Sequence, residues 1–184
     1  MDSVSLDKVL VRNILQHPNE YRWTMQDIGL LGLRLDDRRE YRLHVWCPDR
    51  ATAPPVIHDH PYDFVSRIVV GELTNMRYRE DPSGSKYVRD RYSPPDEELR
   101  TTDMVQLTSA SETYREGDEY AQSAPELHDS RQMPGTVTIL RMTFRGVREL
   151  TTCRREDDQW VSGLSRPATT DEVRDITAIA LYRF

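Results

Sequence analysis

The chain is poor in cysteine, has no long apolar run and carries no excess of positive charge. Cys47 and Cys153 are the two cysteines among 184 residues, too few for a disulfide framework, which favours a reduced cytoplasmic protein. No stretch approaches the roughly 18 apolar residues that span a bilayer, and residues 1–10 lack the pattern of a secretion signal. The formal net charge is −6 and the pI is near 5.4, so the chain as a whole repels polyanions. We therefore expect neither a nucleic acid nor a membrane as a partner.

Periodic patterns predict a helix near each end of a globular chain. Apolar residues make up 37% and charged residues 30% of the sequence, as is typical of a folded domain. A helix over residues 5–16 is predicted by apolar residues at helical spacing, namely Leu6, Val9, Leu10 and Ile14. Thr169 and Glu172 have the spacing of a capping box. A second helix is therefore expected, with an apolar face of Val173, Ile176 and Ile179.

Short strands separated by turns are expected between the two helices. They are expected at 41–47, at 56–60, within 65–79 around Gly71, at 104–108, 112–116 and 118–122, and at 136–144. Residues 81–103 are polar and contain Pro82, Gly84, Pro94 and Pro95, which predicts a long hairpin or insertion. Many short strands separated by turns favour a sandwich or a barrel.

Two of the five histidines form the sequence His58-Asp59-His60. On a strand, side chains two residues apart point to the same face. The two imidazoles could then reach one metal ion while Asp59 points away. Imidazole suits zinc, iron, copper and nickel, so this segment is a candidate metal site, although such a pair also occurs for packing.

The spacing around these histidines resembles the first motif of the cupin superfamily. His58 and His60 stand at its histidine pair and Gly71 at its closing glycine, whereas Thr52 replaces the opening glycine and Phe64 the glutamate. The second cupin motif is matched at Gly117 and His128. Its other positions carry substitutions, namely Ser123 for proline, Pro125 for glycine and Gln132 for asparagine.

The resemblance covers about residues 41–144 and implies an all-β double-stranded β-helix, the cupin barrel. We expect a helical N-terminal extension packed on the barrel (1–40), the barrel (41–150), and a C-terminal extension with a helix (151–184). The segment 81–103 would then cover one mouth of the barrel or mediate pairing. Because cupins often dimerise, a homodimer is expected by analogy.

The resemblance implies that His58, His60 and His128 hold one divalent metal ion. Phe64 cannot ligate, so three neutral imidazoles would leave the metal its full charge. This favours an anionic or chelating co-ligand and open coordination positions. Asp63 is adjacent and could swing in as a ligand, although a strand would point it outward.

Six further residues are candidates for a pocket beside the metal. Arg42 could anchor a substrate, and His44 on the same strand face could act as acid or base or be structural. Tyr62 and Phe64 share the phase of the histidines and could wall the pocket. Tyr120 could donate to a bound ligand. These three aromatic residues could equally form core. Arg141 shares a face of the strand 136–144 with Val137 and Ile139, and could clamp a carboxylate or lie at a solvated rim.

Locally, Ile57–His60 followed by Gly71-Glu72-Leu73 is similar to the cysteine-dioxygenase-like thiol oxygenases, which implies ferrous iron. We therefore predict a metal-dependent cupin enzyme. The leading hypothesis is a mononuclear non-haem iron(II) oxygenase, an oxidoreductase of the dioxygenase type, that acts on a small polar or anionic metabolite. One alternative is a redox-silent lyase or isomerase that uses zinc, nickel or manganese as Lewis acid. The other is a non-catalytic cupin that binds a small molecule.

Overall fold

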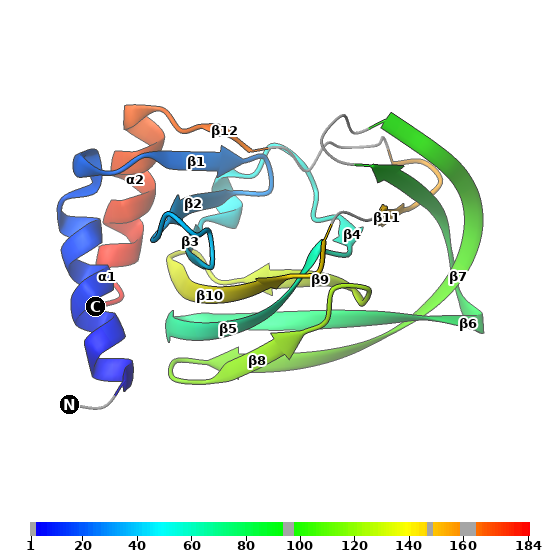
Figure 1. Cartoon of the computed structure of the whole chain (residues 1–184), viewed down its shortest axis with the longest axis horizontal. Coiled ribbons are helices and arrows are strands. Elements are labelled where there is room, and N and C mark those ends of the chain that lie inside the picture. Colours follow the sequence, from blue (N-terminus) through cyan, green and yellow to red (C-terminus); the bar gives the residue numbers. More distant parts are fainter. Residues whose placement is uncertain (1–2, 94–97, 147–148, 159–164) are drawn as a thin grey trace.

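Two antiparallel β-sheets carry most of the chain in the computed structural model, which describes residues 3–93, 98–146, 149–158 and 165–184 (Figure 1). The larger sheet has the order β12-β1-β2-β3-β10-β5-β8 and the smaller one the order β11-β4-β9-β6-β7. The strands of the larger sheet are β1 (Trp23–Gln26), β2 (Leu30–Arg34), β3 (Tyr41–Trp46), β5 (Tyr62–Val70), β8 (Glu119–Gln122), β10 (Thr136–Phe144) and β12 (Arg166–Pro167). The smaller sheet consists of β4 (Ile57–His58), β6 (Glu72–Ser93), β7 (Glu98–Arg115), β9 (Leu127–Gln132) and β11 (Leu150–Arg154). The helices are α1 (Ser3–Gln16) and α2 (Thr170–Leu181), with short 3-10 turns η1 (Pro18–Glu20) and η2 (Pro48–Arg50).

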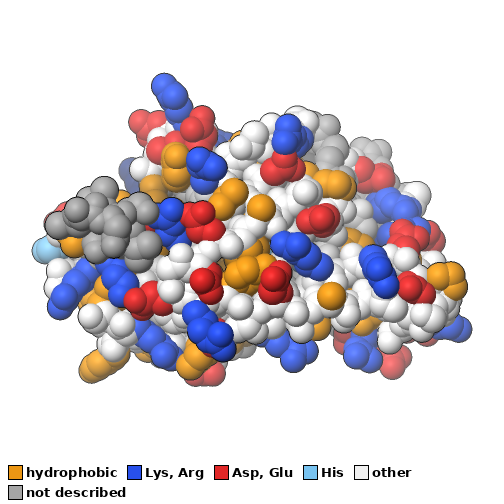
Figure 2. Space-filling model, turned by 90° about the horizontal axis from the view of Figure 1, so that it is seen from below, with side chains coloured by type: hydrophobic (Ala, Val, Ile, Leu, Met, Phe, Trp, Pro, Cys, Tyr) orange, Lys and Arg blue, Asp and Glu red, His pale blue; other side chains and the backbone are white. Residues whose placement is uncertain are grey.

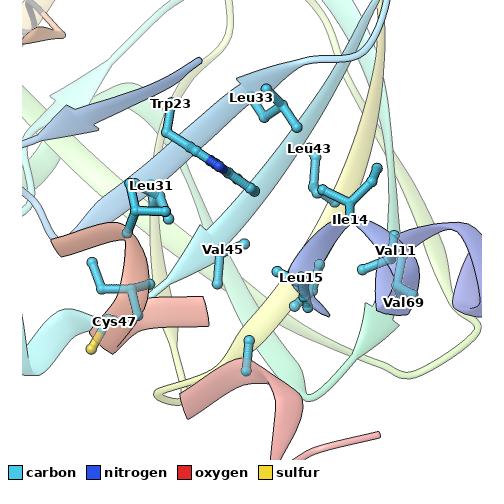
Figure 3. Close-up of a cluster of buried hydrophobic side chains, with 14 of the residues drawn as sticks. Val11, Ile14, Leu15, Trp23, Leu31, Leu33, Leu43, Val45, Cys47 and Val69 are labelled. Carbon is cyan, nitrogen blue, oxygen red and sulfur yellow. The ribbon is translucent and has the colours of Figure 1, made fainter. Parts of the chain in front are cut away.

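The outer face of the larger sheet is covered by the two helices, which lie together at one end of the molecule (Figure 1). Leu43 and Val45 of β3 and Val137 of β10 belong to a buried cluster that also includes residues of both helices (Figure 3). Successive residues of a strand point to opposite faces. Arg42 and His44, which alternate with Leu43 and Val45, therefore point to the other face, toward the space between the sheets.

The inner faces of the two sheets share a second apolar cluster. Phe64, Ile68, Leu140 and Met142 come from the larger sheet and Leu73 from the smaller one. These side chains are buried and join the sheets as the two layers of a sandwich. The predicted all-β fold with a helix near each end is therefore confirmed, and its two antiparallel sheets are compatible with a cupin.

The first helix buries Ile14 of its predicted apolar set but leaves Val9 and Leu10 exposed. Val9 and Leu10 are 61% and 47% exposed, whereas Val11, Ile14 and Leu15 are buried against the sheet. Both sets have helical spacing, so the pattern predicts the helix but does not fix its rotation about its own axis. At the second helix, Thr169 accepts a hydrogen bond from the Glu172 backbone and the capping box is complete, as predicted.

Of the two structures predicted for residues 81–103, a long hairpin or an insertion, the described residues form the hairpin. β6 and β7 form one long hairpin that pairs across much of its length and holds both Pro82 and Gly84 within β6. A side chain at Gly84 would lie 2.4 Å from the Leu107 backbone, so glycine allows the two strands to approach at this irregular point. The two strands predicted at 104–108 and 112–116 are one strand, β7.

The N-terminal segment contains more than the predicted helix. β1 and β2 lie within residues 1–40 and extend the larger sheet beside β3. The domain boundaries 1–40, 41–150 and 151–184 remain predictions. Among the described residues, no helix has the length and apolar character needed to cross a membrane. Figure 2 shows acidic and basic side chains interspersed over one face of the molecule.

Candidate metal centre

Three histidines from two segments far apart in the sequence meet on the inner side of the smaller sheet. His58 on β4 lies directly opposite His128 on β9 in the register of the strands. The ring centroids are 4.7 Å apart for His58 and His60, 4.9 Å for His58 and His128, and 5.0 Å for His60 and His128. The predicted strand 56–60 is wrong in extent, because β4 ends at His58. His60 follows it in an irregular segment whose backbone N–H donates to the Ala124 carbonyl, so backbone pairing rather than strand alternation turns His60 toward His58.

The donor set of this three-histidine cluster fits one metal ion. One ligand atom from each residue can be chosen so that all three lie within 4.8 Å of one another. The Nε2 atoms of His60 and His128 are 2.9 Å apart. Two imidazole nitrogens bound at about 2.1 Å with a right angle at the metal would be about 3.0 Å apart. The ligand nitrogen of His58 lies within 4.8 Å of those of His60 and His128, so the three could converge on one ion.

Hydrogen bonds at the far side of two rings fix which nitrogen faces the centre. His58 Nδ1 donates to the Val56 carbonyl oxygen at 2.8 Å, and His128 Nδ1 donates to Asn75 Oδ1 at 2.9 Å. Both rings therefore carry their proton on Nδ1 and leave Nε2 available as a ligand, the arrangement typical of metal-binding histidines. Asn75 is itself held in place, because its Nδ2 donates to Gln122 Oε1 at 3.1 Å.

Burial keeps His60 and His128 in the protonation state that a metal requires. The pKa values of His60 and His128 lie well below the ordinary value of 6.5, first because burial penalises the charged ring and then because of the neighbouring charge of His58. Histidine binds a metal as neutral imidazole. The two rings are therefore ready to ligate at neutral pH.

No carboxylate belongs to the three-histidine cluster among the described residues that could ligate a metal. Phe64 stands at the cupin glutamate position. Its ring centroid lies 5.2 Å from that of His60 and 5.8 Å from that of His128. Asp63 points away, since it accepts hydrogen bonds from the Ala124 backbone and from Arg145. Asp59 also points away from the cluster, as expected, and accepts a hydrogen bond from the Thr151 backbone.

The structure brings three of the other predicted site residues to the cluster. Tyr62 stacks on His60 with ring centroids 4.9 Å apart, and the Arg42 guanidinium lies 5.8 Å from the Tyr62 ring centroid. Phe64 contacts both His60 and His128, as described above. Arg42, Tyr62 and Phe64 thus form a wall of the larger sheet that faces the three-histidine cluster.

His44 and Tyr120 are buried, and each packs against another aromatic residue. His44 packs edge-on against Trp46 with ring centroids 5.9 Å apart, and burial, with a smaller effect of Arg42, lowers its pKa to about 3. Tyr120 contacts Phe64 and stacks on Tyr114. Burial raises the pKa of Tyr120 to about 12.

The structure does not bring Arg141 to the cluster. Arg141 is exposed and lies on the face of β10 that carries Val137, which packs toward the helices. β10 is apolar on both faces because helices cover one side and the second sheet the other. Its sequence therefore did not reveal which face turns toward the histidines.

Sequence reasoning missed Asn75 and Gln122, the pair that positions His128. Both are almost fully buried, at 1% and 2% exposure. The sequence could have indicated Asn75, because it lies two residues after Leu73 on β6 and so points to the same, buried face. A polar side chain in an apolar phase must find buried partners.

The fold and the donor set together define an all-β sandwich, compatible with a cupin, whose three histidines could hold a divalent metal ion. No protein-family model and no curated protein matches the chain. Among solved structures, the chain is similar to Drosophila melanogaster CENP-C in a crystal structure of CENP-C bound to CAL1. The identity is 12% and the TM-score 0.32, with 84% of this chain and 100% of that chain covered. A TM-score of this size carries no argument about fold or function.

Proposed function

We propose that the protein is a metal-dependent cupin enzyme, a mononuclear non-haem iron(II) oxygenase that acts on a small polar or anionic metabolite. The observation that carries the proposal is the set of three neutral imidazoles with no carboxylate beside them among the described residues. Three neutral ligands leave a divalent ion its charge, which favours an anionic substrate on the metal. When bound, ferrous iron would supply the one-electron chemistry toward dioxygen that side chains lack.

The chain's own residues would hold the ion, exclude water and orient the substrate. His58, His60 and His128 would bind the ion through their inward nitrogens. Tyr62 and Phe64 cover the His60 ring on two sides and would keep water from this part of the centre. Arg42, 5.8 Å from the Tyr62 ring, would attract an anionic substrate toward the metal.

The redox-silent alternative, a lyase or isomerase, requires a general base whose pKa lies near the operating pH. The pKa values of the two residues expected to act as this base lie far from neutral pH. His44, with a pKa of about 3, binds a proton too weakly, and Tyr120, with a pKa of about 12, holds its proton too tightly. This contrast favours the oxygenase.

Oxygen uptake by protein loaded anaerobically with iron(II) tests the proposal. We expect substrate-dependent uptake with at least one member of a panel of small thiols and organic acids, and none in His58→Ala. Arg141→Ala is the matched control and keeps the uptake, since Arg141 is exposed on the opposite face. Turnover of a substrate by the zinc-loaded protein without oxygen would overturn the oxygenase in favour of the lyase or isomerase. A ligand that raises thermal stability without being transformed by either form would favour the binding protein.

A further inference from the structure

The inner face of β3 carries buried polar atoms that the protein itself does not satisfy. Arg42, His44 and Trp46 alternate with the helix-facing Leu43 and Val45, so all three point between the sheets. Trp46 is 8% exposed and Arg42 half-buried. Among the described residues, neither Trp46 Nε1 nor Arg42 Nε has a hydrogen-bond partner.

A third such atom lies on the neighbouring strand. Thr138 of β10 stands directly opposite His44 of β3, so its side chain is on the same inner face. Thr138 is 1% exposed, and its hydroxyl also has no hydrogen-bond partner in the part of the chain that the structure describes. Buried polar groups without partners are rare and costly in folded proteins. The presence of three such atoms on one face therefore points to a ligand that hydrogen-bonds to them.

A second tryptophan and a second threonine of the core do have hydrogen-bond partners within the protein. The Trp23 indole donates to the Pro18 carbonyl oxygen at 2.9 Å. The Thr136 hydroxyl, two residues before Thr138, donates to the Glu72 carbonyl oxygen at 3.0 Å. Unpartnered buried atoms also occur elsewhere among the described residues, as at the Thr152 hydroxyl, so the inference rests on the position of the three donors on one face beside the histidines and not on their number.

Arg42 connects this set of unsatisfied groups to the three-histidine cluster. Arg42 lies against Tyr62, and Tyr62 stacks on His60. Arg42 Nε and Trp46 Nε1 are donors only, and the threonine hydroxyl can donate. The occupant that fits these donors is a molecule with oxygen acceptors and negative charge.

We propose that the inner face of β3, with Arg42, Trp46 and Thr138, binds the oxygen-bearing chain of a small organic acid beside the three-histidine cluster. This inference deepens the proposed function and rests on it for the metal next to the acid. The acid's oxygens accept hydrogen bonds from the Arg42 and Trp46 N–H groups and from the Thr138 hydroxyl. The Arg42 guanidinium also compensates the acid's charge.

The indole N–H resonance of Trp46, assigned by its loss in Trp46→Phe, reports on this subsite directly. We expect succinate to shift this resonance saturably and its neutral analogue succinamide to leave it in place. The Trp23 resonance is the internal control, since that indole is already bonded. The titration is run on metal-free and on metal-loaded protein. A Trp46 resonance that acetate, malonate and succinate all leave unshifted in both forms overturns the subsite.

Thr138→Val and Thr136→Val separate a ligand-binding role from a structural one. Thr138→Val is expected to weaken succinate binding about tenfold, the value of one hydrogen bond to a charged acceptor, without lowering stability in the absence of ligand. Thr136→Val is expected to lower stability and leave succinate binding unchanged. The reverse result, in which Thr138→Val lowers stability and leaves binding unchanged, overturns the proposal. Because the resonance is also read without metal, failure of the subsite is distinguishable from failure of the metal site.

Discussion

Substitution of Asn75 by leucine should weaken metal binding through His128 without removing a ligand. Asn75 accepts a hydrogen bond from His128 Nδ1 and donates one to Gln122, at 1% exposure. Asn75→Leu keeps the approximate volume of the side chain but leaves the His128 N–H and the Gln122 oxygen buried without partners.

The magnitudes follow from these two lost bonds. A buried polar group without a partner costs about 1–3 kcal/mol, so the free energy of unfolding of the metal-free protein should fall by about 2–6 kcal/mol. Loss of the group that orients a metal-bound histidine typically weakens metal affinity about 10–100-fold. Both effects have the same origin but are measured separately.

Urea unfolding of the metal-free protein gives the first quantity, and competition with a chelator of known affinity gives the second. Gln122→Leu is the matched control. It also removes a buried hydrogen bond to Asn75, but it leaves the bond between Asn75 and His128. We expect Gln122→Leu to destabilise the protein while it changes metal affinity much less than Asn75→Leu does. Equal metal affinities for Asn75→Leu and the wild type would refute the reasoning.

Three further predictions concern pH and the fold. The pKa of His44 is about 3 in the folded protein and about 6.5 in the unfolded chain. Its neutral ring therefore adds stability that is fully present above pH 6.5 and is lost as the pH falls toward 3. Urea unfolding at pH 7.5 and pH 5 should show a smaller loss of stability on acidification in His44→Gln than in the wild type, by about 2 kcal/mol; equal losses would contradict the assignment. Thr169→Ala removes the cap of α2 and should cost about 1 kcal/mol in the same assay, whereas no cost would mean that the cap is not formed in solution. Gly84→Ala places a methyl group against the Leu107 backbone and should cost about 2 kcal/mol, and wild-type stability would show that β6 and β7 are not so close there.

Sequence patterns predicted those elements in which one physical constraint dominates. The strand 136–144 was predicted because it is a continuous apolar run bounded by turns. The helix at 170–181 was predicted because its cap and its apolar face agree. The three-histidine cluster was predicted because the spacing of the cupin motifs places residues far apart in sequence on facing strands.

The remaining features depend on contacts that do not show in local sequence. The long hairpin of β6 and β7 is polar over much of its length and contains Pro82 and Gly84, so its sequence left a hairpin and an insertion both open; pairing between the two strands decides for the hairpin. The exposed position of Arg141 could not be predicted, since both faces of β10 are apolar beside it. The missing hydrogen-bond partners of Trp46 Nε1 and Thr138 Oγ1 among the described residues can be recognised only in the folded structure, where β3 pairs with β10.

The amount of metal bound to the protein tests the central claim most directly. Protein purified without a histidine tag, loaded anaerobically with iron(II) and desalted, is compared by elemental analysis with a His58→Ala His128→Ala variant. The account predicts close to one metal ion per chain in the wild type and almost none in the variant. Wild-type protein that holds no metal after iron loading, or a variant that holds as much as the wild type, would contradict it.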